Sequence, residues 1–306
     1  MTRRGKLPDD LGTTFSVSDA RNLGVSRSRL RSVDLDSPFR GVRQHSEDAP
    51  VEHFARQRHE LLRLCRAFDT VAPEGYAYSH QTAALLLGIA VPTRLRGLDV
   101  LHVTVPPGHQ PRRRGVVTHR LTEPARKSID GLPVLPPERV WVQLGSSLTV
   151  DESVIAGDCL VRRKGPMSTL DRMTDALGQA AGRRGVGVSR AALPLIRPGT
   201  DSPPESELRL VLVRAGLPEP VIRHTVTHNG SWVGTPDLAY VRHRVALEYQ
   251  GEGHRTHEVF EDDVERIERF REAGWTVIQI TRRQLRHPAG IIAKVRRALL
   301  ESGARV

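Results

Sequence analysis

The chain has 306 residues, of which 38% are hydrophobic and 26% are charged, so it can build packed cores and about two domains. Aromatic residues make up only 4%, which argues against a protein that holds nucleic acid chiefly by base stacking. The 46 Lys and Arg against 35 Asp and Glu give a net charge of +11, which favours a polyanionic partner. Two cysteines cannot form a disulfide framework, and the basic N-terminus lacks the apolar run of a signal peptide, so we expect a cytoplasmic protein with no membrane contact.

The positive charge is concentrated in the first two thirds of the chain. Residues 201–306 hold 16 Lys and Arg against 15 Asp and Glu, whereas residues 1–200 hold 30 against 20, a net of +10. A general arginine excess that serves only solubility is the alternative explanation. We expect the phosphate-binding surface to be N-terminal.

Residues 15–43 have the pattern of a winged helix-turn-helix. Ser16 is placed to cap a first helix that Gly24 ends, and Ser26 a second helix that reaches Ser32 with Leu30 and Val33 inward. Residues 35–44 would form the wing. The second helix would carry the arginines that reach phosphates and guanine edges, although a plain helical hairpin with solvated arginines fits the same pattern. These expected DNA-binding residues are Arg27, Arg29 and Arg31.

The middle of the chain alternates between helical and strand patterns. Helices are expected over 48–69 (with Phe54 on the apolar stripe), 79–88, 136–147, 151–163 and 168–181, and strands over 100–105 and 115–120. A basic loop precedes the second strand and adds three candidate DNA-binding residues, Arg112, Arg113 and Arg114. Residues 182–204 are rich in Gly, Arg, Pro and Ser, which indicates one short helix followed by a linker.

The last hundred residues predict a compact α/β unit. Helices are expected over 204–215, 258–273 and 288–301, and strands over 221–227, 232–241, 244–250 and 276–281. In the third of these strands Val245, Leu247 and Tyr249 alternate with Glu248 and Gln250, so the two polar residues share one face.

Antiparallel pairing of the two preceding strands can bring Asp237 and Glu248 onto the same face. Two converging carboxylates repel unless a cation lies between them, and oxygen ligands suit Mg²⁺ or Mn²⁺. Gln250 would point at the same site and orient a water or a phosphate oxygen. Glu205 is a candidate third ligand, but Ser202 and Glu205 also match a capping box, and the sequence leaves both roles open.

Three sequence runs in this region together resemble the PD-(D/E)XK nuclease superfamily, and within it the branch similar to very-short-patch-repair endonucleases. They are T-P-D-L-A-Y, V-A-L-E-Y-Q-G-E-G-H and D-D-V-E-R-I-E-R-F-R-E-A-G-W-T-V-I-Q-I-T, and the resemblance covers 202–301. It implies a mixed sheet flanked by helices and metal-dependent hydrolysis of DNA, with Asp237 and Glu248 as metal ligands. Gln250 stands where the superfamily usually has Lys, and so a cation near the transition state is missing.

Two further motifs follow from this resemblance. His254 matches the G-x-x-H pattern and would contact the scissile phosphate or protonate the leaving group; a surface histidine is the alternative. Asp263 and Arg266 match D-x-x-R, and at a spacing of three on a helix they are also a simple ion pair. His254 and His257 lack thiol or carboxylate partners at zinc spacing, so we predict no zinc site there.

Residues 15–163 resemble the N-terminal part of AbiEi-type antitoxins. The runs that carry this likeness are F-S-V-S-D-A-R-N-L-G-V-S-R-S-R-L, S-H-Q-T-A-A-L-L-L-G and V-L-H-V-T-V-P. The resemblance implies DNA binding by a winged helix-turn-helix joined to an α/β middle domain.

Together these patterns predict four segments: a winged helix-turn-helix at 1–47, an α/β middle domain at 48–182, a linker at 183–203 and an endonuclease-like domain at 204–306. We expect a Mg²⁺- or Mn²⁺-dependent endodeoxyribonuclease. The alternative is a DNA-binding, antitoxin-like repressor with an inactive nuclease fold, which implies a cognate toxin as partner. A homodimer and an RNA substrate are left open by the sequence.

Overall fold

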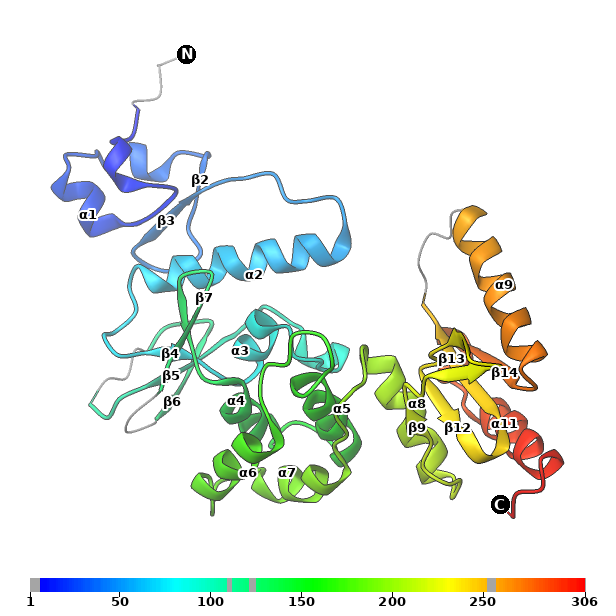
Figure 1. Ribbon diagram of the computed structural model, residues 1–306. Helices are drawn as coiled ribbons and strands as arrows, with labels where there is room; N and C mark the ends of the chain where they lie inside the picture. The colour runs from blue at the N-terminus through cyan, green and yellow to red at the C-terminus, as the bar shows by residue number, and fades with distance from the viewer. Residues whose placement is uncertain (1–5, 109–111, 121–124, 252–256, 306) are drawn as a thin grey trace. The chain divides into compact units, whose positions relative to one another are not determined.

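The computed structural model describes residues 6–108, 112–120, 125–251 and 257–305, and of residues 257–264 it describes the backbone alone. The chain is a mixed α/β protein with sheets flanked by helices (Figure 1). It divides into two units: unit 1 comprises residues 1–146 and 179–186, and unit 2 comprises 147–178 and 187–306. In the described part of the chain, no helix is long and apolar enough to cross a membrane.

Unit 1 begins with a small three-stranded sheet beside a short helix. The sheet has the order β1-β3-β2, and Ser16 caps the helix by accepting a hydrogen bond from the Asp19 amide at 3.0 Å, as expected. The elements are β1 (Thr14–Ser16), α1 (Val17–Asn22), β2 (Leu35–Asp36) and β3 (Val42–His45). Strands β2 and β3 pair antiparallel where the wing was expected.

The expected second helix of this region is only a 3-10 turn, Arg29–Arg31. The Ser26 hydroxyl accepts from the Arg29 amide at 3.2 Å, which is the bond expected of an N-cap. The turn ends early because the backbone becomes extended at Ser32. Val33, expected inside, is 82% exposed. The prediction of a full helix with Leu30 and Val33 inward was therefore wrong, although Leu30 itself is buried.

The middle of unit 1 is a five-stranded sheet with the order β6-β5-β4-β8-β7. Its two expected strands, β5 and β6, are present and run parallel. The strands are β4 (Ala77–Tyr78), β5 (Leu101–Val105), β6 (Val116–Arg120), β7 (Lys127–Ile129) and β8 (Leu132–Val134), and the helices are α2 (His53–Asp69), α3 (His80–Leu87) and α4 (Pro137–Leu144).

An aromatic cluster joins the first residues of unit 1 to this sheet. The Phe68 ring on α2 makes edge-to-face contacts with Phe39, Tyr76 and Tyr78 at centroid distances of 6.0, 5.5 and 6.2 Å. The buried Tyr78 hydroxyl donates to the Cys65 carbonyl at 2.6 Å. Phe54, expected on the same apolar stripe of α2, is instead 64% exposed because the buried face begins about two turns later, at Leu61.

Unit 2 contains a four-stranded mixed sheet between helices (Figure 1). Its order is β14-β13-β12-β9, with β13 and β14 parallel and the other pairs antiparallel. Its strands are β9 (Val221–Ile222), β12 (Leu238–Tyr240), β13 (Val245–Gln250) and β14 (Thr276–Thr281). Strands β10 (Val226–His228) and β11 (Ser231–Gly234) form a separate antiparallel pair.

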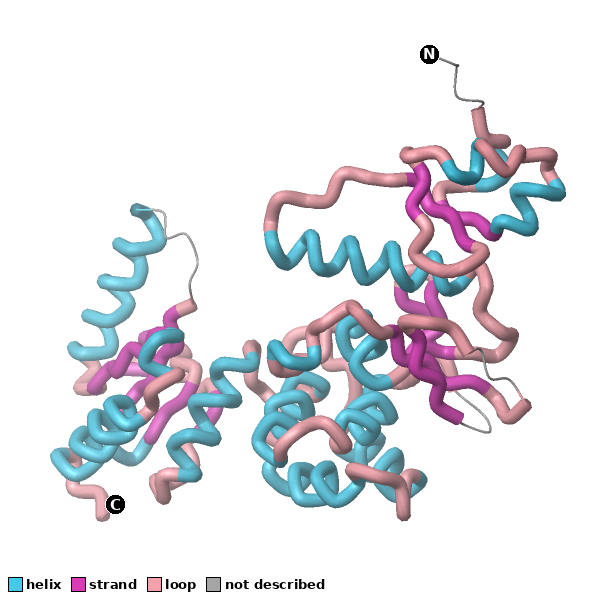
Figure 2. The backbone as a smooth tube through the Cα atoms, turned by 180° about the vertical axis from the view of Figure 1, so that it is seen from behind, coloured by secondary structure: helices cyan, strands magenta, loops and turns pink. Residues whose placement is uncertain are grey.

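Two helices of unit 2 correspond to those expected over 151–163 and 168–181. The helices of this unit are α5 (Val150–Leu160), α6 (Leu170–Gln179), α7 (Val186–Ala192), α8 (Pro203–Arg214), α9 (His257–Glu272), α10 (Arg282–Leu285) and α11 (Ala289–Glu301). Of these helices, α8, α9 and α11 pack on the strands of this unit, and Figure 2 shows the same backbone from behind. The expected strand over 232–241 is interrupted at Pro236, which cannot donate a ladder hydrogen bond.

The two faces of this sheet pack against different helices. Leu238, Tyr240 and Leu247 belong to a core with residues of α8 and α11. Ala239 and Ala246 belong to a second core with Phe270 at the C-terminal end of α9. The alternation expected for residues 245–250 is therefore realised, and Glu248 shares the face of the α9 core.

A buried arginine attaches α5 to α8. Arg209 is 1% exposed, and its guanidinium pairs with the fully buried Asp158 at 2.9 Å and with Glu219 at 2.7 Å. Because an unpaired buried charge is costly, the two helices must belong to one unit. The division of the chain into two units differs from the expected segments, whose boundaries were set at 182 and 203. Those segment boundaries stay a prediction.

Replacing Arg209 by Met should lower the free energy of unfolding by about 3–5 kcal/mol, since Asp158 would be left buried without its partner. The matched control is Arg214→Met, because Arg214 joins the same two helices through an exposed pair with Asp151 at 2.6 Å. We expect the control to cost at most about 1 kcal/mol in urea unfolding. Equal losses in the two variants would contradict this role for Arg209.

Candidate active site

Asp237 and Glu248 meet on the hairpin formed by β12 and β13. Leu238 pairs with Leu247, and continuing this antiparallel register by one residue sets Asp237 opposite Glu248. The Asp237 Oδ2 atom also accepts a hydrogen bond from the Tyr249 amide at 2.8 Å, which fixes the carboxylate across the strands. The convergence expected from the alternation pattern is thus present in the structure.

Glu248 is buried whereas Asp237 is partly buried, and their environments differ. Glu248 is 2% exposed, and its Oε2 atom pairs with the Arg266 guanidinium of α9. Its Oε1 atom is buried and has no hydrogen-bond partner among the described residues. An unsatisfied buried carboxylate oxygen is costly, so the position is suited to accept a donor or a cation.

Burial raises the pKa of Asp237 above its usual range, and the neighbouring charge of Glu248 adds to this effect. The Tyr249 amide and the guanidinium groups of Arg223 and Arg266 act in the opposite direction. The site therefore holds two acidic groups whose simultaneous ionisation depends on nearby positive charge.

Glu205 lies at the start of α8, where both of its oxygens already have partners. Oε2 accepts from the Asp201 amide at 2.9 Å, and Oε1 accepts from the Ser202 hydroxyl at 2.8 Å. These bonds tie Glu205 to the residues that precede α8, but Ser202 makes no side-chain capping bond, so the capping box expected as the alternative is not formed. Burial raises the pKa of Glu205, and the charge of Asp237 contributes to the increase, so this third carboxylate lies near the pair.

The other expected residues of this site have different outcomes. Gln250 is the last residue of β13 and has the same strand parity as Glu248. His254 lies outside the described residues, as does the side chain of Asp263. Arg266 was interpreted as a partner of Asp263, but it pairs with Glu248 on the face of the sheet that α9 covers. The D-x-x-R motif was the sequence signal that pointed to Arg266. Nothing in the sequence singled out Arg223, the other guanidinium that lowers the pKa of Asp237.

The expected DNA-binding arginines all lie in unit 1, in unequal surroundings. Arg29 is held by Asp34 through two bonds of 3.0 and 2.8 Å, which gives it a structural role. Arg27 and Arg31 are exposed, but the shortened helix removes the shared helical face that was expected for them. In the basic loop Arg112 and Arg114 are exposed, and Arg113 donates to the Arg40 carbonyl at 2.6 Å.

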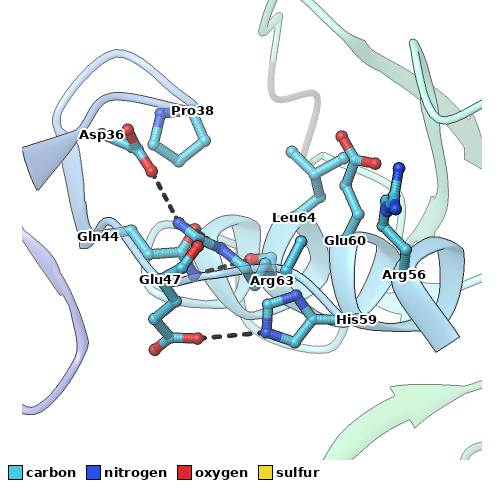
Figure 3. Close-up of a pocket in the computed structure, with 10 residues that line it drawn as sticks. Asp36, Pro38, Gln44, Glu47, Arg56, His59, Glu60, Arg63 and Leu64 are labelled. Atoms are coloured by element: carbon cyan, nitrogen blue, oxygen red, sulfur yellow. Dashed lines mark hydrogen bonds and ion pairs between the residues drawn. The ribbon is translucent and has the colours of Figure 1, made fainter. Parts of the chain in front are cut away.

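A pocket of about 440 Å³ lies beside α2 in unit 1 (Figure 3). Its charged groups are paired with one another: Arg63 contacts Asp36 at 2.8 Å, and His59 contacts Glu47 at 3.3 Å. Arg56 is engaged by backbone carbonyls at the start of the helix. Because the charged side chains other than Glu60 already have partners, we assign no chemistry to this pocket.

Two relatives from Mycobacterium tuberculosis align with most of the chain. They are the uncharacterized proteins MT2308, from strain CDC 1551 / Oshkosh, and Rv2248, from strain ATCC 25618 / H37Rv. Each is 25% identical over 241 residues, which cover 78% of this chain and 87% of the relative. No protein-family model matches the chain, and no solved structure matches it.

Replacing Arg266 by Gln should destabilise unit 2, because the buried Glu248 and the neighbouring Asp237 lose a counter-charge. We expect a lower melting temperature that Mg²⁺ raises again, and by more than it raises that of the wild type. Arg271→Gln, an exposed position on the same helix, is the control. Thermal unfolding with and without Mg²⁺ measures both effects; a variant that Mg²⁺ does not stabilise would contradict a cation site at these carboxylates.

Proposed function

We propose that the protein is a metal-dependent endonuclease, with unit 2 hydrolysing phosphodiester bonds of DNA and the basic unit 1 holding the duplex. The observation that carries the proposal is the pairing of the partly buried Asp237 with the buried Glu248, in which Glu248 Oε1 lacks a partner among the described residues. The resemblance of residues 202–301 to PD-(D/E)XK nucleases points to the same two residues. A DNA substrate also favours the cytoplasm as the location.

The donor set fits a hard divalent cation. Carboxylate oxygens are the ligands of Mg²⁺ and Mn²⁺, and Asp237 and Glu248 would hold such an ion. When bound, the cation would supply a Lewis acid for the phosphate and lower the pKa of a water nucleophile. Tyr249 orients Asp237 through its amide, and Gln250 would position water or a phosphate oxygen. Glu205, whose oxygens accept from the Asp201 amide and the Ser202 hydroxyl, would add a third negative charge near the pair.

One observation favours the second candidate, an antitoxin-like DNA-binding repressor without nuclease activity. Arg266 already neutralises Glu248. A structural ion pair of this kind would let the nuclease-like fold persist without any metal. This alternative keeps the DNA-binding role of unit 1 and implies a toxin as the partner.

Cleavage should depend on Asp237 and not on the charge of Glu205. We expect Asp237→Asn to abolish Mg²⁺- or Mn²⁺-dependent nicking of supercoiled plasmid, because a ligand charge is lost while the packing is kept. Glu205→Gln can still accept from the Asp201 amide, so it should retain activity within about tenfold. Gel assays with metal and with EDTA measure both variants. Undiminished cleavage by Asp237→Asn would disprove the site, and an inactive but DNA-binding wild type would favour the repressor.

DNA affinity should fall with salt in proportion to the phosphates that the arginines of unit 1 contact. Each contact contributes about −0.9 to the slope of log affinity against log salt. The double variant Arg112→Ala/Arg114→Ala should therefore reduce the slope by about two. Arg242→Ala/Arg286→Ala, which removes two exposed charges of unit 2, is the control. Fluorescence anisotropy of a labelled duplex decides the matter, and a larger effect in the control would assign DNA binding to unit 2.

A further inference from the structure

Three histidines from separate elements of unit 1 converge at one point. His80 is the first residue of α3, His102 lies in β5, and His119 lies in β6. One ring nitrogen from each lies within 4.8 Å of the other two. His102 Nδ1 and His119 Nε2 are 3.0 Å apart, and the His80 ring stacks on His119 with a centroid distance of 3.6 Å.

The parallel pairing of β5 with β6 fixes two members of the cluster. His102 pairs with Val117, and Thr104 pairs with His119, so both imidazoles lie on one face of the sheet. The His102 amide donates to the Thr82 hydroxyl at 2.8 Å, which ties this strand to α3.

His80 is held in an unfavourable backbone conformation. Its φ of 50° lies in the left-handed region, which is costly for a residue with a side chain. The Gln143 side chain stabilises it by accepting from the His80 amide at 3.1 Å, and the fully buried Ser79 hydroxyl lies 3.1 Å from His80 Nδ1. The strained backbone conformation of His80 therefore directs its imidazole toward the other two rings.

The three rings are in the protonation state that metal binding requires. Burial lowers the pKa of His80 to about 3 and that of His102 to about 4, and their mutual repulsion with His119 adds to the decrease. Burial also lowers the pKa of His119. At neutral pH each imidazole is uncharged and keeps one lone pair for a cation.

We propose that His80, His102 and His119 form a zinc site, with the fourth position open to water. Three histidines and one open position are a ligand set that zinc adopts in proteins. Tetrahedral Zn²⁺ with Zn–N bonds of about 2.05 Å separates two ligand nitrogens by about 3.3 Å, close to the 3.0 Å between His102 and His119. Imidazole ligands disfavour Mg²⁺, so the site is chemically distinct from the carboxylates of unit 2.

The test uses the full chain in an Asp237→Asn/Glu248→Gln background, freed of metal with a chelator. Zn²⁺ affinity is measured by competition with a chromophoric chelator, in excess Mg²⁺. We expect His102→Asn and His119→Asn each to weaken binding by more than about 100-fold, beyond what loss of an outer-shell partner costs. His53→Asn, an exposed position of the same unit, should leave the affinity unchanged. Equal affinity in His119→Asn and the parent would overturn the proposal.

A second measurement keeps the test decisive where a histidine variant fails to fold. The protein without these substitutions is treated with diethyl pyrocarbonate with and without Zn²⁺, and modified histidines are mapped by mass spectrometry. We expect Zn²⁺ to protect His80, His102 and His119 but not His53. Co²⁺ should also give the visible absorption of a four-coordinate ion. Unprotected histidines with no Co²⁺ spectrum would overturn the site.

Discussion

The antiparallel register of β12 against β13 sets Asp237 opposite Glu248 inside a buried hairpin, and this pairing constrains the rest of unit 2. Nearby positive charge favours ionisation of both carboxylates there, since burial and the charge of Glu248 raise the pKa of Asp237. Helix α9 supplies Arg266, and it can do so because Phe270 on the same helix packs on this face of the sheet. The approach is close: a Cβ on Gly234 would lie 2.7 Å from the Phe270 ring.

A guanidinium and a divalent cation are alternative solutions to the same electrostatic problem. Arg266 satisfies one oxygen of Glu248 and leaves Oε1 without a partner among the described residues. Only one of the two Glu248 oxygens is thus paired with positive charge. An arginine that moves away when metal binds would act as a placeholder, whereas one that stays would make the pair structural. The choice between a nuclease and a repressor depends on this single contact.

Much of unit 2 could be predicted because its signals are local. The alternation in residues 245–250 placed Glu248 on one face, and the spacing of apolar residues gave the order of helices and strands. The partner of Arg266 could not be predicted, since it depends on how α9 crosses the sheet. In the same way the attachment of α5 to α8 rests on Arg209 and Asp158, which are far apart in sequence.

Unit 1 shows where local patterns fail. Ser16 correctly marked the start of α1, but Ser26 and Arg29 close a single turn where a recognition helix was expected. The histidine cluster was missed because its members lie on three elements at no motif spacing. Only the pairing of β5 with β6 brings two of them together.

The most direct test is a crystal structure of the protein grown with Mn²⁺, with anomalous scattering recorded for the metal. A nuclease site predicts an anomalous peak bound by both Asp237 and Glu248, with the Arg266 guanidinium displaced from Glu248. A map without a peak at these carboxylates, and with Arg266 still paired to Glu248, would contradict the account.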